Sequence, residues 1–215
     1  IKQNRKRKSK TSLADLRTLP AHSSDILIFR KQGGIGDVLT MTPAIRAVWK
    51  KFPGCRIHVG VDPRYFNGAL SKVLKYNPYI HRVIPWQISG GVKYAATADL
   101  TFTAVREEMA KQIRSRIDMF AGACGVQPAS RKPYYVVTDD EDQAILEWMA
   151  KEGIPRTAKI VVVTPASNND KKDWPVPRYR ELVNALVPNN KDLHVVVTHL
   201  DTRHEWEATS RIHNL

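Results

Sequence analysis

At 215 residues, the chain is long enough for one large domain or two small ones. Its hydrophobic fraction of 42% is sufficient for a folded core, which excludes a disordered polypeptide. No apolar run approaches the roughly 20 residues that cross a bilayer, and the basic N-terminus lacks the apolar segment of a secretory signal. The net charge of +13 favours anionic partners, which include nucleic acid, lipid headgroups and phosphorylated glycolipids.

Residues 1–20 are interpreted as a basic flexible arm. The first ten residues contain six lysines and arginines and no acid. Such an arm either docks on a nucleic acid, a membrane surface or an assembly partner, or is simply a solvated tail. Leu13, Leu16 and Leu19 indicate a short helix that packs onto the body of the protein.

The stretch from Asp25 to Pro53 predicts a strand, a glycine-rich turn and a helix. Residues 26–29 form an apolar run typical of a strand that is covered on both faces. Gly33, Gly34 and Gly36 allow a tight turn, and helical spacing of apolar residues begins at Val38. Thr42-Pro43 indicates a bend or restart near the helix N-terminus.

This order places Asp37 at the carboxyl end of a strand and beside a helix N-terminus. Ligands of open α/β sheets bind at that edge, and the helix end favours an ionised carboxylate, as a general base requires. Asp37 is therefore a candidate catalytic base, and the alternative is a residue that only caps the helix.

Gly34-x-Gly36, followed by Leu39, forms an incomplete G-x-G-x-x-G pattern, which is weak evidence for a dinucleotide site. A phosphate-binding P-loop is excluded because no Gly-Lys-Ser or Gly-Lys-Thr follows the glycines. A nicotinamide-dependent oxidoreductase remains the lowest-ranked alternative.

Further elements alternate along the chain, which predicts an α/β protein with a doubly wound parallel sheet. Arg114 and Arg116 are candidates for binding an anionic acceptor, or else lie on a solvated helix face. The expected strands are 56–61, 81–85, 98–105, 133–137, 160–163 and 193–198, and the expected helices are 66–74, 107–124, 139–151, 177–186 and a final one that begins at 202.

The loop that joins the strand at 160–163 to the following helix contains Ser167, Asn168, Lys171 and Lys172. Small polar residues and lysines in such a loop form a plausible phosphate-binding site, because lysine supplies a positive point charge and Ser or Asn supplies hydrogen bonds. A lysine-rich surface turn is the alternative.

Cys55 and Cys124 lack metal-ligand spacing, which predicts buried free thiols in a reducing compartment. The seven histidines form no H-x-x-x-H or H-E-x-x-H pair, so no metal site is predicted. These features predict a cytoplasmic location.

Several segments resemble glycosyltransferase family 9, the heptosyltransferase family. The similarity is carried by GGIGDVLTMTPAIRAVWKKFPGCRIHV, by Asn77-Pro78 with Ile80, Val83 and Ile84, by residues 116–126, and by Pro165-Ala166-Ser167 with Lys172-Asp173-Trp174-Pro175.

The resemblance implies a GT-B-like protein with two Rossmann-type domains, at residues 21–155 and 156–215. It also implies that Asp37 is the catalytic base, that Gly34 and Gly36 line the cleft, and that Ser167, Asn168 and Lys172 hold the donor's phosphates. The family's later Asp-Ser/Thr-Gly-x-x-His motif is absent from this sequence, so the second domain is expected to be incomplete.

The function implied by the resemblance is transfer of a heptose-like sugar from an ADP-linked nucleotide sugar to an anionic glycolipid or saccharide, as in lipopolysaccharide biosynthesis. The nucleotide sugar is a co-substrate, and no cofactor is expected. Peripheral association with the inner membrane face is left open. The rival hypothesis is a non-catalytic docking protein on a degenerate glycosyltransferase scaffold, which binds nucleic acid or a larger assembly through its basic arm.

Overall fold

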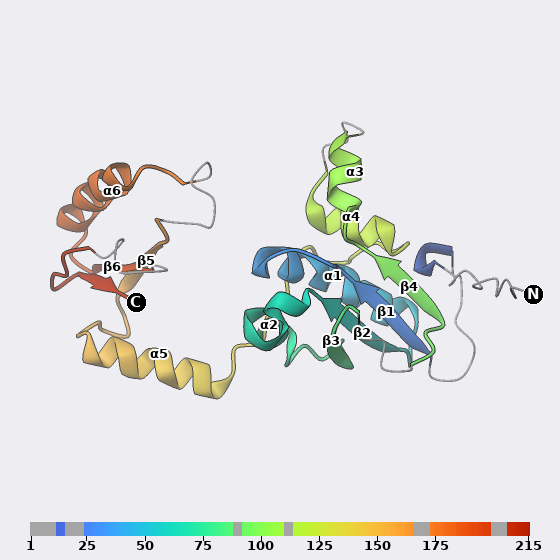
Figure 1. Ribbon diagram of the computed structural model, residues 1–215. Helices are drawn as coiled ribbons and strands as arrows, with labels where there is room; N and C mark the ends of the chain where they lie inside the picture. Colours follow the sequence, from blue (N-terminus) through green and yellow to red (C-terminus); the bar gives the residue numbers. More distant parts are fainter. Residues whose placement is uncertain (1–11, 16–23, 88–91, 110–113, 166–172, 199–205) are drawn as a thin grey trace, which may run out of the picture. The chain divides into compact units, whose positions relative to one another are not determined.

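A computed structural model describes residues 12–15, 24–87, 92–109, 114–165, 173–198 and 206–215 (Figure 1). The chain divides into two compact units, Ile1–Val136 and Val137–Leu215. Each unit contains a parallel sheet and its own hydrophobic core. The α/β class with parallel sheets that the sequence predicts is thus confirmed.

The first unit is built on a four-stranded parallel sheet of order β3-β2-β1-β4. Its strands are β1 (Asp25–Phe29), β2 (Arg56–Val61), β3 (Arg82–Pro85) and β4 (Ala96–Asp99). Its α-helices are α1 (Ile35–Lys51), α2 (Ser71–Leu74), α3 (Thr103–Met109) and α4 (Arg116–Ala123), and short helical turns lie at η1 (Leu13–Asp15), η2 (Pro63–Tyr65) and η3 (Phe66–Leu70).

The main core of this unit lies on one face of the sheet. Successive strand side chains point to opposite faces, so Ile26 and Ile28 of β1 join this core while Leu27 joins a smaller cluster on the other face. Helix α1 buries Met41 and Ile45 against the sheet, and α4 adds the fully buried Phe120. Both faces of β1 are therefore covered, as its continuous apolar run predicts.

Helix α1 continues through Pro43, so the bend or restart expected there is wrong. Proline has no N–H, and the carbonyl of Leu39, four residues earlier, therefore lacks its usual helical donor. The Thr42 hydroxyl donates to this carbonyl at 2.7 Å, and it accepts the Tyr134 N–H at 2.8 Å. One buried hydroxyl thus satisfies the gap in the helix and ties the chain at Tyr134 to α1.

Part of the N-terminal segment packs on the sheet. Ser12 forms a parallel bridge with Thr97 of β4, and Leu13 is completely buried in the main core. The predicted packing of Leu13 is confirmed. The remainder of the basic arm, residues 1–11 and 16–20, lies outside the described residues.

Two elements after β3 differ from the prediction. Strand β4 ends at Asp99 rather than continuing to 105, because the Asp99 carboxylate accepts the Thr101 N–H and turns the chain into α3. A single helix over 107–124 is also wrong: Ser115 accepts the Asp118 N–H and caps α4 as a new helix. Met109, expected on the buried stripe, is 81% exposed.

The second unit contains a three-stranded parallel sheet of order β5-β6-β7. Helix α6 covers one face and α5 the other, since Val195 and Val197 of β6 pack with Val183 of α6 while Val196 packs with Met149 of α5. Its elements are α5 (Asp139–Lys151), β5 (Lys159–Val163), α6 (Val176–Asn189), β6 (Leu193–Val197) and β7 (Ile212–Asn214).

The division between the units falls earlier than the expected position after residue 155. Helix α5 belongs to the second unit because Met149 and Ile154 share a cluster with Val196 of β6. Residues 133–137, expected as a strand, form no strand; Tyr134 instead bonds to the Thr42 side chain of α1. The final segment is strand β7, so the helix expected over 202–215 is wrong for the described residues 206–215.

The thiols of Cys55 and Cys124 are buried and unpaired, as predicted. Burial raises the pKa of the Cys124 thiol to about 12. Cys124 is therefore protonated and serves as a small apolar core residue.

A chain of polar groups, in which both histidines are buried and Glu152 is partly exposed, links the end of α5 to the sheet of the second unit. His194 Nδ1 lies 3.1 Å from His213 Nε2, and His213 Nδ1 lies 3.4 Å from Glu152 Oε2. Because a carboxylate only accepts hydrogen bonds, the bond to Glu152 requires a proton on His213 Nδ1, and the His213 Nε2 lone pair then accepts from His194 Nδ1 in the tautomer that carries no proton there. Burial, followed by the charges of His213 and Arg211, lowers the pKa of His194.

We expect this arrangement to destabilise the second unit in acid. The unfolded chain protonates His194 near its ordinary pKa of 6.5, whereas the folded pKa is lower. Stability is therefore complete above pH 6.5 and is lost as the pH falls towards the folded pKa. Amide hydrogen exchange of β6 and β7, measured across this range, should show protection falling with pH more steeply in the wild type than in His194→Asn. The asparagine keeps a donor near Nδ1 but does not titrate, so equal slopes would contradict the expectation.

Candidate active site at the ends of strands β1 and β4

The candidate site lies where β1 and β4 end side by side. Phe29 and Asp99 are partners in the last register position of these strands, and Leu100 N–H still donates to the Phe29 carbonyl. The chain after β1 then runs through residues 30–34 into α1, and the chain after β4 runs through residues 100–102 into α3. Carboxyl ends of parallel strands are where ligands bind in open α/β sheets.

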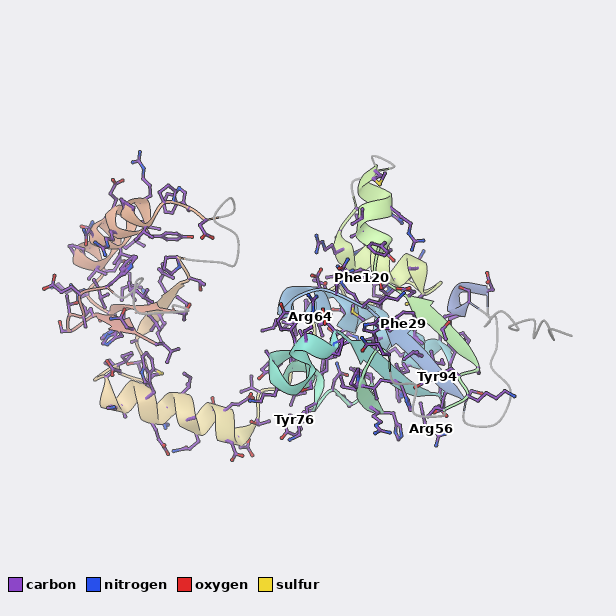
Figure 2. The ribbon with its side chains drawn as sticks, in the orientation of Figure 1. Phe29, Arg56, Arg64, Tyr76, Tyr94 and Phe120 are labelled. Carbon is purple, nitrogen blue, oxygen red and sulfur yellow. The ribbon has the colours of Figure 1, made fainter. Side chains whose placement is uncertain are left out.

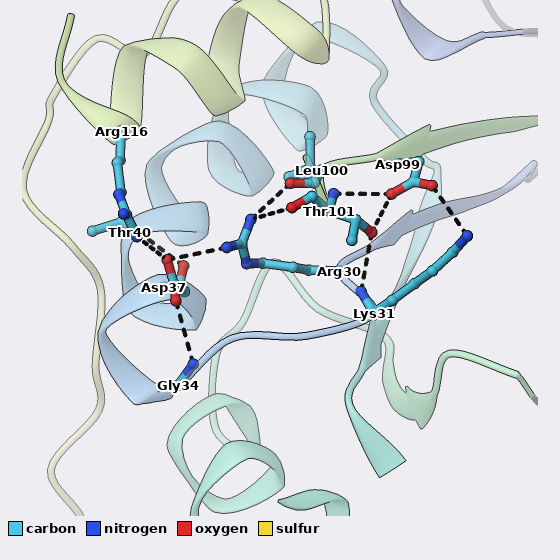
Figure 3. Close-up of polar contacts among 9 residues, drawn as sticks. All are labelled: Arg30, Lys31, Gly34, Asp37, Thr40, Asp99, Leu100, Thr101 and Arg116. Carbon is cyan, nitrogen blue, oxygen red and sulfur yellow. Dashed lines mark hydrogen bonds and ion pairs between the residues drawn. The ribbon is translucent and has the colours of Figure 1, made fainter. Parts of the chain in front are cut away.

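Asp37 occupies the first turn of α1, as the sequence predicts (Figure 3). Its Oδ2 accepts the Gly34 N–H at 3.3 Å, so the carboxylate does cap the helix. Its Oδ1 lies 2.5 Å from Arg116 Nη1 and 3.4 Å from Arg30 Nη2. The side chain is 17% exposed, so a ligand can still reach it. Capping is confirmed, while the catalytic role stays a prediction.

Arg30 is the residue that holds this corner together (Figure 3). Its side chain is only 11% exposed, and its Nη1 donates to the carbonyls of Leu100 and Thr101 at 2.8 and 3.1 Å. The guanidinium also lies over the Phe120 ring, 5.4 Å from its centroid. Burial lowers the pKa of Arg30, and the nearby charge of Asp37 opposes this effect. Arg30 therefore joins the β1 loop, the β4 loop and α1.

Sequence reasoning missed Arg30. The available signal was a cation directly after an apolar strand and just before the glycine turn, where a side chain lies at the edge of the sheet. Arg116, by contrast, is a candidate from the sequence, as a residue of an expected helix that either binds an anionic acceptor or is solvated. The structure brings Arg116 to Asp37 from 79 residues away, while its side chain remains 50% exposed.

A second cluster of polar side chains, formed by Lys31, Asp99 and Thr101, lies at the same edge of the sheet and fixes the loop after β4 (Figure 3). Lys31 Nζ is 3.6 Å from Asp99 Oδ2, and the Lys31 N–H donates to the Thr101 hydroxyl at 3.1 Å. That hydroxyl donates to Asp99 Oδ1. Lys31 also lies 5.0 Å from the centre of the Trp86 ring. These contacts are internal to the loops and stabilise their shape.

Among the turn glycines, Gly33 is the one whose lack of a side chain the structure requires. Its φ of +139° is unfavourable for other residues, and a Cβ there would lie 2.6 Å from Arg30 Nε and 2.9 Å from Asp37 Oδ2. Gly34 and Gly36 have no atom within 4 Å of such a Cβ. Their surroundings are open, as a residue lining a ligand site requires.

Helix α4 contributes a polar pocket as well as Arg116. The pocket has a volume of about 710 Å³ and is lined by Arg114, Asp118 and Arg131, with Gly122 and Gly125 among its other residues. Hydrogen bonds from Arg131 and Ser115 lower the pKa of the Asp118 carboxyl. The pocket therefore holds two guanidinium groups and one ionised carboxylate, a net positive lining.

In the second unit, the candidate phosphate-binding residues Ser167, Asn168 and Lys172 lie outside the described residues. The described ends of their loop lie at the carboxyl edge of the second sheet and before α6. Thr164 Oγ1 lies 2.8 Å from Thr198 Oγ1 at the carboxyl ends of β5 and β6. The Trp174 and Tyr179 rings pack edge-on, with their centroids 4.8 Å apart.

Across the residues the structure describes, no three His, Cys, Asp or Glu side chains gather in a way that would hold a metal ion. None of the described helices is long and apolar enough to cross a membrane.

Residues 83–215 match the model of the family described as Glycosyltransferase family 9 (heptosyltransferase), which is more than half of the chain. The chain belongs to this family. No curated protein matches the sequence.

Solved structures share the fold at low sequence identity. The crystal structure of the glycosyl transferase family 9 protein from Veillonella parvula DSM 2008 is 16% identical, with a TM-score of 0.65 over 84% of this chain and 64% of that one. E. coli heptosyltransferase WaaC with ADP-2-deoxy-2-fluoro heptose is 17% identical, with a TM-score of 0.55 over 89% of this chain and 76% of that one. E. coli ADP-heptose lps heptosyltransferase II is 14% identical, with a TM-score of 0.58 over 88% of this chain and 72% of that one. These neighbours are of GT-B type, which confirms the predicted fold class.

The chain spans less than two thirds of the Veillonella parvula protein. The family match includes α4 with Arg116 and the loop with Lys172, but it begins after the motif at residues 26–59 that contains Asp37. For Asp37, the assignment therefore depends on the motif and on the local geometry described above.

Gly33→Ala tests whether this family 9 loop needs the close approach of Arg30 to Asp37. We expect it to lower the free energy of unfolding by about 1–3 kcal/mol, because the backbone conformation and the crowded Cβ are both unfavourable. The measurement is urea denaturation. Gly34→Ala is the matched control and should be nearly neutral, since its Cβ meets no neighbour. Equal effects of the two substitutions would contradict this account of the turn.

Proposed function

We propose that the chain is part of a glycosyltransferase that moves a heptose-like sugar from an ADP-linked nucleotide sugar to a hydroxyl of an anionic glycolipid or saccharide. The observation that carries this proposal is the Asp37 carboxylate, held at the carboxyl edge of the sheet by the Gly34 N–H, Arg30 and Arg116. Membership of family 9 and the GT-B fold support the reaction class.

Asp37 acts as the general base. As the acceptor oxygen attacks the anomeric carbon, a new C–O bond forms, the bond to the donor's diphosphate breaks, and the hydroxyl proton passes to the carboxylate. The two oxygens of Asp37 have different surroundings: Oδ1 faces two guanidinium groups, whereas Oδ2 accepts one long hydrogen bond at 3.3 Å. Oδ2 is therefore the oxygen with a lone pair left for the proton.

Ser167, Asn168 and Lys172 bind the donor's phosphates. A lysine ammonium stabilises the charge that develops on the leaving diphosphate, and small polar side chains orient its oxygens. In this mechanism the lysine supplies the positive charge, so a metal cofactor is not part of the proposal. An ADP-linked donor is proposed because the similar E. coli WaaC structure contains ADP-2-deoxy-2-fluoro heptose.

The acceptor side is assigned to the first unit. The pocket on α4, with Arg114 and Arg131, suits an anionic acceptor group such as the phosphate or carboxylate of a lipopolysaccharide-type glycolipid. A cytoplasmic location is proposed as well, supported by two buried free thiols.

The rival proposal is a docking protein that uses its basic arm. It is favoured by the six lysines and arginines in the first ten residues, which precede the segment anchored on β4 by Ser12. This candidate requires no chemistry at Asp37, so the catalytic variant below separates the two proposals.

Asp37→Asn, in the natural full-length protein, should lower the rate of sugar transfer by about 10²–10⁴-fold, because the base is lost while the size of the side chain is kept. The measurement is product formation from ADP-heptose by mass spectrometry, together with a melting curve to show that the fold is intact. Asp99→Asn, a carboxylate at the same sheet edge, is the control and should keep most activity. Near-normal turnover by Asp37→Asn would remove Asp37 from the mechanism.

The donor site is tested by thermal shift against ADP-, UDP-, GDP- and CMP-sugars. A ligand that binds only the folded state stabilises it, by about 2.7 kcal/mol at a hundredfold excess over Kd. We expect the ADP-sugar to raise the Tm selectively, and Lys172→Ala to reduce that rise. Lys191→Ala, an exposed lysine of the same unit, should leave it unchanged. A full ADP-sugar shift in Lys172→Ala would overturn the phosphate-binding assignment.

A further inference from the structure

The positive charge of the chain is concentrated in one unit. Residues 1–136 contain 24 lysines and arginines and 8 acidic residues, whereas residues 137–215 contain 10 lysines and arginines and 13 acidic residues. The net charges are therefore +16 and −3. Any partner attracted by the overall charge of +13 is attracted to the first unit.

Within this unit, the stretch from residue 38 to residue 98 is almost free of acids. It contains nine lysines and arginines and a single acid, Asp62. Asp62 is 2% exposed and is bonded by the Arg64 guanidinium at 2.6 Å and by the Arg64 N–H at 3.0 Å. Asp62 is therefore paired with Arg64 and does not offset the other cations of this stretch.

Part of this stretch forms a groove between α2 and the start of β3, which we call the α2–β3 groove. Its volume is about 320 Å³, and its lining consists of Ser71, Lys72, Lys75, Ile80, His81, Arg82 and Val83. Within the described part of the chain, no ion pair joins a carboxylate to Lys72, Lys75 or Arg82. Three cations thus line one hollow without a neutralising acid, and they suit an anionic ligand.

An aromatic side chain lies beside the groove. Tyr76 lies two residues after the end of α2 (Figure 2) and is 51% exposed, and its ring centre lies 4.8 Å from Lys75 Nζ. Tyrosine favours boundaries where one side is apolar and the other is wet, such as the headgroup level of a membrane. The groove lies at the start of β3, whereas Asp37 follows the end of β1, so the groove is separate from the candidate active site.

We propose that the α2–β3 groove binds the headgroup of an anionic phospholipid and docks the first unit on a membrane surface. The cations attract the phosphate, and the exposed tyrosine adds contact at headgroup depth. A single hollow of this size fits one headgroup, whereas a nucleic acid strand requires cations that follow several phosphates in succession. The inference goes beyond the proposed function, because the groove lies at the amino ends of the strands and the candidate active site at their carboxyl ends.

The test is flotation of the full chain with vesicles of phosphatidylcholine alone, or of phosphatidylcholine mixed with phosphatidylglycerol. Neither a nucleotide sugar nor a glycolipid is present. We expect binding only to the phosphatidylglycerol vesicles. K72Q/K75Q/R82Q should lower the binding constant for these vesicles by about a hundredfold, because each cation removed lowers it by about fivefold. K151Q/R156Q/K191Q removes the same charge from exposed positions of the second unit and should leave binding unchanged.

Three outcomes would overturn the proposal. The first is equal vesicle binding by K72Q/K75Q/R82Q and the wild type. The second is loss of all binding on deletion of residues 1–11, with the groove variant unaffected, which would assign docking to the basic arm. The third is groove-dependent binding to an oligonucleotide without binding to vesicles.

The result is independent of catalysis. Asp37→Asn should bind vesicles as the wild type does, and melting curves would show that the groove variant is folded. If transfer and the donor shift both fail while groove-dependent vesicle binding persists, the proposed function falls and the docking surface stands. If transfer succeeds and vesicle binding does not depend on the groove, only the docking inference falls.

Discussion

The partly buried ion pair between Arg30 and Asp37 is the contact on which the first unit's candidate site depends. A guanidinium that is largely removed from water loses hydration, and it is retained only where several groups replace that hydration. Here the replacements come from three segments: the carboxylate of Asp37 at the start of α1, and the carbonyls of Leu100 and Thr101 after β4. Arginine suits this position because its planar fork reaches different acceptors at the same time.

The same ion pair explains why the turn before α1 is rich in glycine. Gly33 lies so close to Arg30 and Asp37 that a Cβ would overlap both side chains, and its φ of +139° disfavours other residues. Gly34 and Gly36 have no such neighbours. Packing around the ion pair thus accounts for Gly33, which precedes the Gly34-x-Gly36 pattern, and leaves the two glycines of that pattern unexplained. Only the two open glycines remain available for contact with a ligand.

The elements that sequence alone predicts well are those whose signal is local. Helix α5 has the predicted bounds because Thr138 and Glu141 form a capping box ahead of an amphipathic segment. Strand β1 follows from its apolar run, and the position of Asp37 follows from the order strand, glycines and helix. The break before α4 was missed because a single side-chain cap at Ser115 interrupts an apolar pattern that is otherwise helical.

The partners of Asp37 were not predictable in the same way, because they are set by topology. Arg30 bonds to carbonyls about 70 residues later, and Arg116 reaches Asp37 across 79. Both contacts require that β4 returns beside β1 and that α4 packs on α1, which no local pattern encodes. The division of the units was missed for a related reason, since α5 is buried against Val196 of β6 and His213 of β7, which come 45 or more residues later in the chain.

Capping and catalysis, which the sequence leaves as alternatives for Asp37, are compatible in this geometry. A general base must be held in one orientation, and a carboxylate that caps its own helix is already oriented by the Gly34 N–H. The two arginines both approach Oδ1, so the charge of the carboxylate is balanced from one side only. Oδ2 keeps a lone pair on a side chain that is 17% exposed. The cap therefore positions the oxygen that the proposed reaction needs.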